Sequence, residues 1–377
     1  MVENAEEPVA ELSRDNRSLR EGFAAKGICS GCGACVTVCQ ILGNKVLRYN
    51  QKTSSLDLEI SSEECRHCGL CYAVCPRKNY LGTSGRKPVD TGNYLGNYRK
   101  FEILRPIDPD ISGLAQGGGL VMAILKSLME IDYLDGAIVS TAGENWTSIP
   151  RVAHTFQELS GSLGMRTAVS TNILFIDKMY GEHLEHQYAG FNDRKYAFVG
   201  PTCMVTAIQN MRKYKLDVAR KIRLTIGLFC LENINYGEIT HQAEVKTKTT
   251  ADEWENVNIK GKFVVRLKGK EEPLEIPLKE FNDIIRGSCH VCLDLVNFDA
   301  DISLGSLGAP PEFSSVFVRT KAGEDALNLV VRQNSVVGIA EVGPVAKAIY
   351  DKALKNIEST ARKKITRNLE QWEELTR

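Results

Sequence analysis

The feature that most constrains this chain is a pair of cysteine runs with the spacing C-x2-C-x2-C-x3-C. The first run comprises Cys29, Cys32, Cys35 and Cys39, and the second comprises Cys65, Cys68, Cys71 and Cys75, followed by Pro76. At this spacing three thiolates bind one cubane iron–sulfur cluster, and the fourth cysteine of each run ligates the other cluster. Zinc ribbons or a disulfide framework are rival interpretations, but zinc sites typically use two ligand pairs separated by a longer gap. The two runs therefore predict two 4Fe-4S clusters and one-electron chemistry.

The composition is that of an ordinary globular protein, with 377 residues, of which 43% are hydrophobic and 25% charged. Basic and acidic residues number 47 each, and this balance gives no support for a nucleic-acid partner. No apolar run is long enough to span a membrane, and the N-terminus lacks the features of a signal peptide. We therefore expect a cytoplasmic protein without a transmembrane segment, either free or peripheral to a membrane complex. In that compartment its twelve cysteines would serve metal or redox chemistry.

The pattern along the chain predicts five segments. They are a polar arm (1–26), an α+β ferredoxin-like module (27–80), a linker rich in Gly, Asn and Tyr (81–107), an α/β domain (108–340) and a C-terminal helix (341–377). Within the module, residues 45–49 and 55–60 alternate in polarity like the two strands of a hairpin.

From residue 108 onward, short apolar strands alternate with helices, which is typical of an α/β domain with a mixed, largely parallel sheet. We expect strands at 136–140, 196–200, 223–229 and 316–320, and helices at 120–130 and 202–214. Residues 244–278 alternate more finely and indicate an antiparallel insertion.

An apolar residue recurs at every fourth position from Val345 to Leu369, which predicts a long C-terminal helix. Two interpretations of this stripe are open: packing on the helix's own domain, or docking on a partner subunit. We favour the first, although a stripe alone does not identify the surface that it covers.

The four remaining cysteines are candidates for a third metal site. Cys203 and Cys230 each follow a predicted strand, at the edge of the sheet where ligands bind in α/β folds, while Cys289 and Cys292 form a C-x2-C pair. These four thiols are sufficient for a third cubane cluster. A zinc site and simple burial of Cys203 and Cys230 as small apolar residues are the alternatives, and the residues alone leave them open.

Two loops are candidates for binding a cofactor. Residues 116–119 form a glycine-rich turn that opens a helix at Leu120, where free backbone N–H groups suit a pyrophosphate, although a plain tight turn explains the glycines equally well. A second Gly/Ser loop is predicted at 301–308. The sequence shows no nucleophile–base arrangement, so hydrolysis has no support.

Taken together, segments 116–121, 199–203, 227–233 and 289–306 resemble the coenzyme F420 hydrogenase/dehydrogenase beta-subunit family. The resemblance covers about residues 100–340. The ferredoxin module in front is similar to the arrangement in the F420H2 dehydrogenase input subunit and the formate dehydrogenase beta subunit of methanogenic archaea. Two departures affect loop geometry and ligand fit: Gly200-Pro-Thr-Cys203 replaces the usual Gly-Thr-Pro-Cys, and Leu295 replaces an aromatic residue.

The resemblance implies an FAD-containing domain that exchanges hydride with F420, a deazaflavin, and a third cluster held by Cys203, Cys230, Cys289 and Cys292. The implied flavin contacts are Gln116, Gly117, Gly118, Gly119, Leu120, Thr202, Asn233, Asp301, Ser303 and Ser306. Lys260, Lys262 and Arg166 are candidates for the anionic tail of F420, although charged residues are more often simply solvated.

We therefore expect a flavin iron–sulfur oxidoreductase of the F420H2 dehydrogenase type. A deazaflavin passes electron pairs as hydride and a cluster passes single electrons, and FAD is able to mediate between them without a general base. The expected partner is a redox subunit or a ferredoxin. The alternatives are a ferredoxin-dependent tetrapyrrole reductase of the chlorophyll pathway and an electron-transfer subunit that makes no bond to a substrate.

Overall fold

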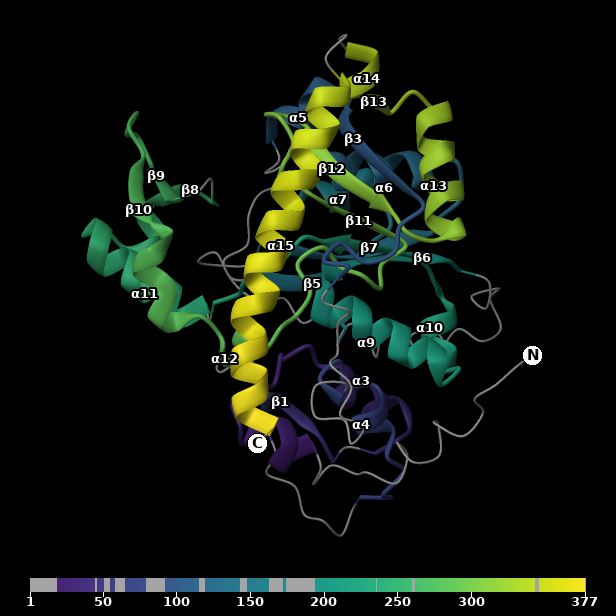
Figure 1. Cartoon of the computed structure of the whole chain (residues 1–377), viewed down its shortest axis with the longest axis vertical. Helices are drawn as coiled ribbons and strands as arrows, with labels where there is room; N and C mark the ends of the chain where they lie inside the picture. Colours follow the sequence, from purple (N-terminus) through teal and green to yellow (C-terminus); the bar gives the residue numbers. More distant parts are fainter. Residues whose placement is uncertain are drawn as a thin grey trace.

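The computed structural model describes residues 19–44, 46–50, 55–57, 65–78, 92–114, 119–142, 148–162, 172–173, 194–234, 236–259, 262–342 and 346–376. A mixed sheet of eight strands lies at the centre, in the order β13-β3-β12-β11-β7-β6-β4-β5 (Figure 1). In chain order these strands are β3 (Lys100–Pro106), β4 (Gly136–Ala142), β5 (Ser148–Ala153), β6 (Tyr196–Pro201), β7 (Ile222–Leu228), β11 (Ile302–Gly305), β12 (Ser314–Val318) and β13 (Val336–Gly338).

The centre of the sheet is parallel. Strands β4, β6, β7 and β11 run in the same direction, while β5 and the group β12-β3-β13 add antiparallel pairings on either side. The predicted α/β fold with a mixed sheet is confirmed. Because the four central strands are parallel, the loops after them emerge at one edge of the sheet.

Helices cover both faces of this sheet. On one face, α6 (Leu120–Glu130) and α13 (Lys321–Arg332) pack on a core that includes Ala137 and Val139. On the other face, α9 (Thr202–Lys213) packs on a core that includes Ile138 and Phe198, with the short α10 (Asp217–Arg220) beside it. Alternate residues of one strand therefore serve opposite cores, as the pleat requires.

Two stretches differ from the sequence expectation. Residues 100–106 belong to the predicted linker but form β3, which pairs with both β12 and β13. Residues 302–305 belong to a predicted loop but form β11, between β7 and β12. In both stretches the pairing partners are distant in sequence, and these tertiary contacts outweigh the local signal of glycine and polar residues.

The C-terminal helix is confirmed as α15 (Ala346–Thr376), which follows the short α14 (Ile339–Val342). Its stripe residues Ala353, Ile357 and Ala361 are fully buried and pack in clusters that include Phe317 and Phe313. This face therefore covers the helix's own chain, in line with the favoured interpretation. The helix runs along the sheet domain and reaches the N-terminal module (Figure 1).

The N-terminal module consists of a short π-helix, two helices and a two-stranded antiparallel ribbon. The elements are η1 (Arg20–Ala24), α3 (Ala34–Ile41), β1 (Arg48–Asn50), β2 (Ser55–Asp57) and α4 (Leu70–Ala73). The predicted hairpin strands are thus present. Phe23 and Tyr72 stack with ring centroids 5.7 Å apart, and Val291 of the sheet domain joins their small core.

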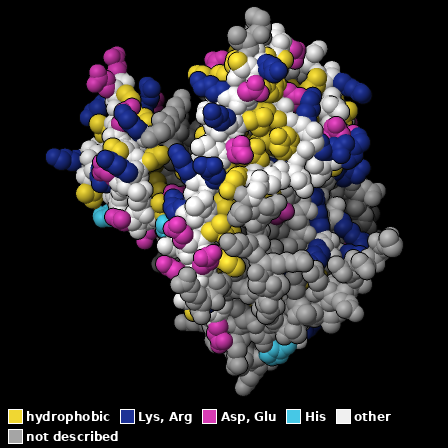
Figure 2. Space-filling view, viewed as in Figure 1, with side chains coloured by type: hydrophobic (Ala, Val, Ile, Leu, Met, Phe, Trp, Pro, Cys, Tyr) yellow, Lys and Arg dark blue, Asp and Glu magenta, His cyan; other side chains and the backbone are white. Residues whose placement is uncertain are grey.

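The insertion forms a lobe of its own, with α11 (Tyr236–Thr247) packed on three antiparallel strands. These are β8 (Trp254–Ile259), β9 (Lys262–Leu267) and β10 (Leu274–Pro277). The antiparallel prediction is confirmed, except that residues 244–247 belong to α11. Figure 2 shows basic and acidic side chains interspersed on this projecting lobe. Among the described helices, none has an apolar stretch long enough to cross a membrane.

Candidate functional site

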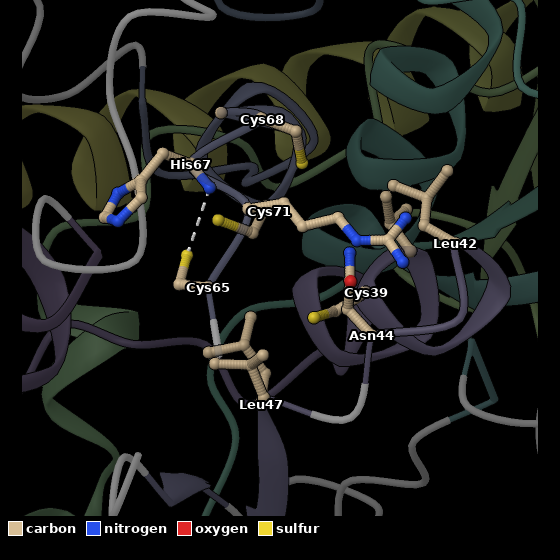
Figure 3. Close-up of a pocket in the computed structure, with 12 residues that line it drawn as sticks. Cys39, Leu42, Asn44, Leu47, Cys65, His67, Cys68 and Cys71 are labelled. Carbon is tan, nitrogen blue, oxygen red and sulfur yellow. Dashed lines mark hydrogen bonds between the residues drawn. The ribbon is translucent and has the colours of Figure 1, made fainter. Parts of the chain in front are cut away.

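Two pockets in the N-terminal module are each lined by four cysteines taken from both runs. Set A consists of Cys29, Cys32, Cys35 and Cys75. Set B consists of Cys39, Cys65, Cys68 and Cys71, and Figure 3 shows its members around one pocket. Each set combines three cysteines of one run with the fourth cysteine of the other, which is the exchange that the spacing predicts.

The backbone around these thiols is shaped by left-handed glycines. Gly33 and Gly69, with φ of 82° and 72°, are the residues before α3 and α4, and each turns the chain so that the third cysteine of its run lies in the first turn of the helix. Backbone amides face the thiols, because the N–H of Gly31 donates to Cys29 Sγ at 3.4 Å. The N–H of His67 donates to Cys65 Sγ at the same distance of 3.4 Å (Figure 3). Backbone N–H donors therefore lie beside the sulfur atoms in both pockets.

The other four cysteines meet at the edge of the sheet. Cys203 lies in the first turn of α9 after β6, Cys230 follows β7, and Cys289 and Cys292 come from α12 (Gly287–His290) and the turn after it. Cys230 lies close enough to Cys289 and Cys292 for thiolates at these positions to repel one another. The same holds for Cys203 with Cys230 and Cys292. We call these four residues set C.

The described residues contain no group of three or more His, Cys, Asp or Glu side chains arranged to hold a metal ion. Ligands of one zinc ion converge on a single point, whereas the four thiolates of a cubane each bind a different iron. The chemistry of the donors, four thiols in each set, fits a cubane cluster.

Set C is surrounded by hydrogen-bond donors and buried cations. The N–H of Asn233 donates to Cys289 Sγ at 3.2 Å. From α15, Lys364 Nζ lies 3.6 Å from Cys292 Sγ, and Asn368 Nδ2 donates to the carbonyls of Cys289 and Cys292 at 2.8 and 2.7 Å. The C-terminal helix is therefore part of the wall of this site.

Burial and charge act differently on these thiols. Burial raises the pKa of Cys230 to about 12 and also raises the pKa values of Cys203 and Cys289. At Cys292 burial acts in the same sense, but the positive charges of Lys364 and Arg77 outweigh it, and the pKa of this thiol lies below its ordinary value. Cys292 is thus the thiol of set C most readily converted to the thiolate that binds metal.

The three sets lie in a row. Cys203 of set C interacts electrostatically with Cys32 of set A, and Cys35 of set A interacts with Cys71 of set B. Arg77 is buried at the junction of sets A and C, and its charge acts on thiols of both sets. The order is therefore C, A, B, from the sheet edge into the N-terminal module.

Comparison with known families decides what this arrangement belongs to. Models of the coenzyme F420 hydrogenase/dehydrogenase beta subunit match residues 105–176 (N-terminal part) and 193–341 (C-terminal part). A model of the 4Fe-4S dicluster domain matches residues 28–79. The chain belongs to the coenzyme F420 hydrogenase/dehydrogenase beta-subunit family.

Two relatives are similar to this chain along most of their length. The chain is 31% identical over 286 residues to the beta subunit of the coenzyme F420 hydrogenase of Methanosarcina barkeri, covering 74% of this chain and 93% of that protein. It is 28% identical to one of the subunits of the F420H2 dehydrogenase of Methanosarcina mazei, covering 80% of this chain and 82% of that protein. A solved structure of the F420-reducing NiFe hydrogenase complex from Methanosarcina barkeri contains a chain that matches with a TM-score of 0.64 and 31% identity, over 74% of this chain and 93% of that one.

Two of the residues that the family resemblance implies as flavin contacts, Gly119 and Leu120, are packed inside the protein at the start of α6. Gln116, Gly117 and Gly118 are outside the described residues. Gly119 has φ of 73° and precedes α6, and Leu120 is buried in the main core. Neither has a polar side chain to offer a ligand, so only their backbone groups are candidates.

Asp301 and Ser303 are also engaged internally. The carboxylate of Asp301 accepts hydrogen bonds from the backbone N–H and hydroxyl of Thr225 and from the hydroxyl of Thr320. The hydroxyl of Ser303 accepts from Arg319 Nε at 2.8 Å. These hydrogen bonds link β11 to β7 and to the residues after β12, and they therefore stabilise the sheet. Ser306 differs, because it follows β11 at the edge that carries set C and is exposed.

Two buried oxygen atoms at this edge have no hydrogen-bond partner among the described residues: Thr202 Oγ1 and Asn297 Oδ1. Asn297 Nδ2 donates to the carbonyls of Gly200 and Leu228, at the ends of β6 and β7. Buried polar atoms are nearly always paired, so these two mark a place for a hydrogen-bonding ligand. Thr202 was expected from the sequence, and its role in binding a ligand remains a prediction.

The two departures from the family pattern have local explanations. Pro201 precedes the first residue of α9 in an extended conformation, so α9 still begins at Thr202 and carries Cys203 in its first turn. Leu295 is buried and packs in the cluster with Ile357 of α15. Of the basic candidates for the F420 tail, Lys262 pairs with Glu275 in the insertion lobe, while Lys260 and Arg166 lie outside the described residues.

Four residues that lie beside set C or the adjoining strand ends escaped the sequence analysis: Arg77, Asn297, Lys364 and Asn368. Two of them left a signal, because Lys364 and Asn368 each follow a residue of the apolar stripe, Ala361 or Ile365, by three positions and so lie on the same side of α15. Polar residues on the buried side of a helix need partners, and that need points to a site.

Proposed function

We propose that this chain exchanges hydride with coenzyme F420 and passes single electrons, by means of FAD and three 4Fe-4S clusters, to or from a redox partner subunit or ferredoxin. One observation carries the proposal: three sets of four thiols lie in a row from the sheet edge to the N-terminal module. Relatives named as F420-linked hydrogenase and dehydrogenase subunits support the choice of F420.

The residues of the three sets would hold the clusters. Their twelve thiols are free of disulfides, Cys32, Cys289 and Cys292 are buried, and Cys35, Cys203 and Cys230 are half-buried. This environment keeps water away and makes each site sensitive to nearby charges such as Arg77 and Lys364. Neighbouring sets that lie side by side suit electron transfer between bound clusters.

The sheet edge beside set C is the proposed flavin site. Thr202 and Asn297 offer unpaired oxygen atoms there, and Ser306 lies at the same edge. When bound, FAD would supply the exchange between the electron pair of a hydride and the single electrons of the clusters. The protein's own contribution is to position the cofactor at the parallel-strand edge, within reach of the first thiol set.

Set B is the proposed contact point for a redox partner. Cys68 is exposed, and Arg66, His67 and Leu42 beside it are also exposed and line the same pocket. Set B is the last in the row, so electrons leave or enter the chain where its thiols approach the surface.

The test is anaerobic isolation followed by iron and flavin analysis and addition of reduced F420. We expect about twelve irons and one FAD per chain, with loss of flavin and cluster absorbance on addition. About eight irons without flavin would leave only an electron-transfer subunit. Full cofactor content with bleaching by reduced ferredoxin or dithionite alone would favour the tetrapyrrole reductase.

A further inference from the structure

Helix α15 lies beyond the part of the chain that the family models match, since these end at residue 341 and the helix begins at Ala346. It nevertheless inserts a lysine into the wall of set C. The side chain of Lys364 is almost completely buried, with the residue 3% exposed. Lysine is almost never fully buried unless its charge is paired, so its surroundings call for an explanation.

The ammonium group of Lys364 has three contacts. Nζ donates to the carbonyl of Cys230 at 2.7 Å and to that of Asp294 at 2.8 Å, and it lies 3.6 Å from Cys292 Sγ. An ammonium has three N–H donors, and these contacts use all of them. None of the three is a carboxylate, so no full negative charge other than a thiolate is in contact with the group.

The nearest acidic side chain is already occupied. The carboxylate of Asp294 accepts the backbone N–H groups of Asn297 and Phe298 at 2.7 and 2.8 Å. One turn along α15, Arg367 forms an ordinary ion pair with Glu232. Lys364 does not use that carboxylate and points toward the thiols instead.

We propose that Lys364 is the counter-charge of a cluster bound by set C and raises the reduction potential of that cluster. This inference rests on the third cluster of the proposed function. A cubane held by four thiolates is an anion and becomes more negative when it is reduced. A fixed positive charge and an N–H donor at Cys292 Sγ therefore stabilise the reduced form more than the oxidised form.

The test is a potentiometric titration of the anaerobically isolated protein, followed by EPR, together with iron and sulfide analysis. The variant Lys364→Met removes the charge and keeps an unbranched side chain that is one heavy atom shorter. Lys363→Met is the matched control, because Lys363 is the adjacent residue on the same helix and is exposed. We expect Lys364→Met to shift one of the three cluster potentials to a more negative value, and Lys363→Met to shift none.

Two further variants keep the test decisive if Lys364→Met loses its iron. Lys364→Gln retains a donor without the charge, and Lys364→Arg retains the charge. The proposal expects the negative shift or the iron loss in Lys364→Gln and its partial reversal in Lys364→Arg. A wild-type potential in Lys364→Gln, or in a Lys364→Met protein with full iron content, overturns the proposal alone. A wild-type protein with about eight irons overturns the third cluster and this proposal together.

Discussion

Arg77 Nη2 donates a 2.9 Å hydrogen bond to the carbonyl of Ser288, joining residues 211 positions apart in the sequence. Arg77 closely follows Cys75 of set A, and Ser288 directly precedes Cys289 of set C. Both residues are buried, at 3% and 2% exposure. This bond fixes the N-terminal module against the sheet domain at the point where the two thiol sets meet.

Replacing Arg77 should therefore loosen that junction. Arg77→Met removes a charge-assisted hydrogen bond and leaves a buried carbonyl with one partner fewer, which costs about 1.5–3 kcal/mol. Thermal unfolding of the anaerobic protein should show a lower midpoint. Arg48→Met is the control, since Arg48 is an exposed arginine of the same module and its loss should cost at most about 0.5 kcal/mol. Equal midpoints for the two variants would show that the bond carries no stability.

Replacing Gly119 with alanine should destabilise the fold more than replacing another glycine of similar backbone conformation. Its φ is 73°, and an added Cβ would lie 2.5 Å from the carbonyl oxygen of Ile111. Gly269 has φ of 70° but meets nothing within 4 Å. Gly269→Ala should cost only the left-handed penalty of about 1–2 kcal/mol, and Gly119→Ala should cost clearly more because the backbone must also shift. Similar unfolding midpoints for the two variants would contradict the close approach of α6 to the residues before it.

The contact between α15 and β3 should weaken in alkali. Tyr350 donates to Glu102 Oε2 at 2.8 Å, and burial together with this carboxylate raises the pKa of Tyr350 to about 12. The ordinary value is about 10, so the unfolded chain releases this proton first. The contribution of Tyr350 is complete below about pH 10 and is lost as pH rises toward 12. Unfolding midpoints measured across this range should fall more steeply for the wild type than for Tyr350→Phe, and parallel curves would refute the shift.

The sequence predicted the cysteine chemistry well because ligand spacing is a local property. The four thiols of each module set lie within two short runs, and the residue types and gaps carry the information. Three of the four strands of the parallel centre, β4, β6 and β7, were also recognisable, since strands covered on both faces are continuous apolar runs, whereas β11 was predicted as a loop. The same rule explains why β3 was missed: it lies near the sheet's margin and has a charged or polar residue at Lys100, Glu102 and Arg105.

The surroundings of the thiols were not predictable in the same way. Lys364 and Cys292, which are in contact, are 72 positions apart in the sequence. Asn297 donates hydrogen bonds to carbonyls at the ends of β6 and β7, which are 97 and 69 positions away. Such contacts depend on how the sheet and α15 pack, which no local pattern encodes. Asp301 shows a further long-range effect, because this polar residue of a family motif bonds to Thr225 and Thr320 within the fold. Its expected role as a flavin contact stays a prediction.

The central claim is that set C connects the F420-binding domain to the two clusters of the N-terminal module, and one variant tests it directly. Cys289→Ser removes a ligand of set C, so iron should fall from about twelve to about eight per chain while the module clusters remain. Each protein is mixed anaerobically with reduced F420, and the module clusters are followed by freeze-quench EPR, with dithionite as the reductant in a parallel sample. We predict that dithionite reduces these clusters in both proteins and that reduced F420 does so only in the wild type. Reduction of the module clusters by F420 at the wild-type rate in Cys289→Ser would contradict the account.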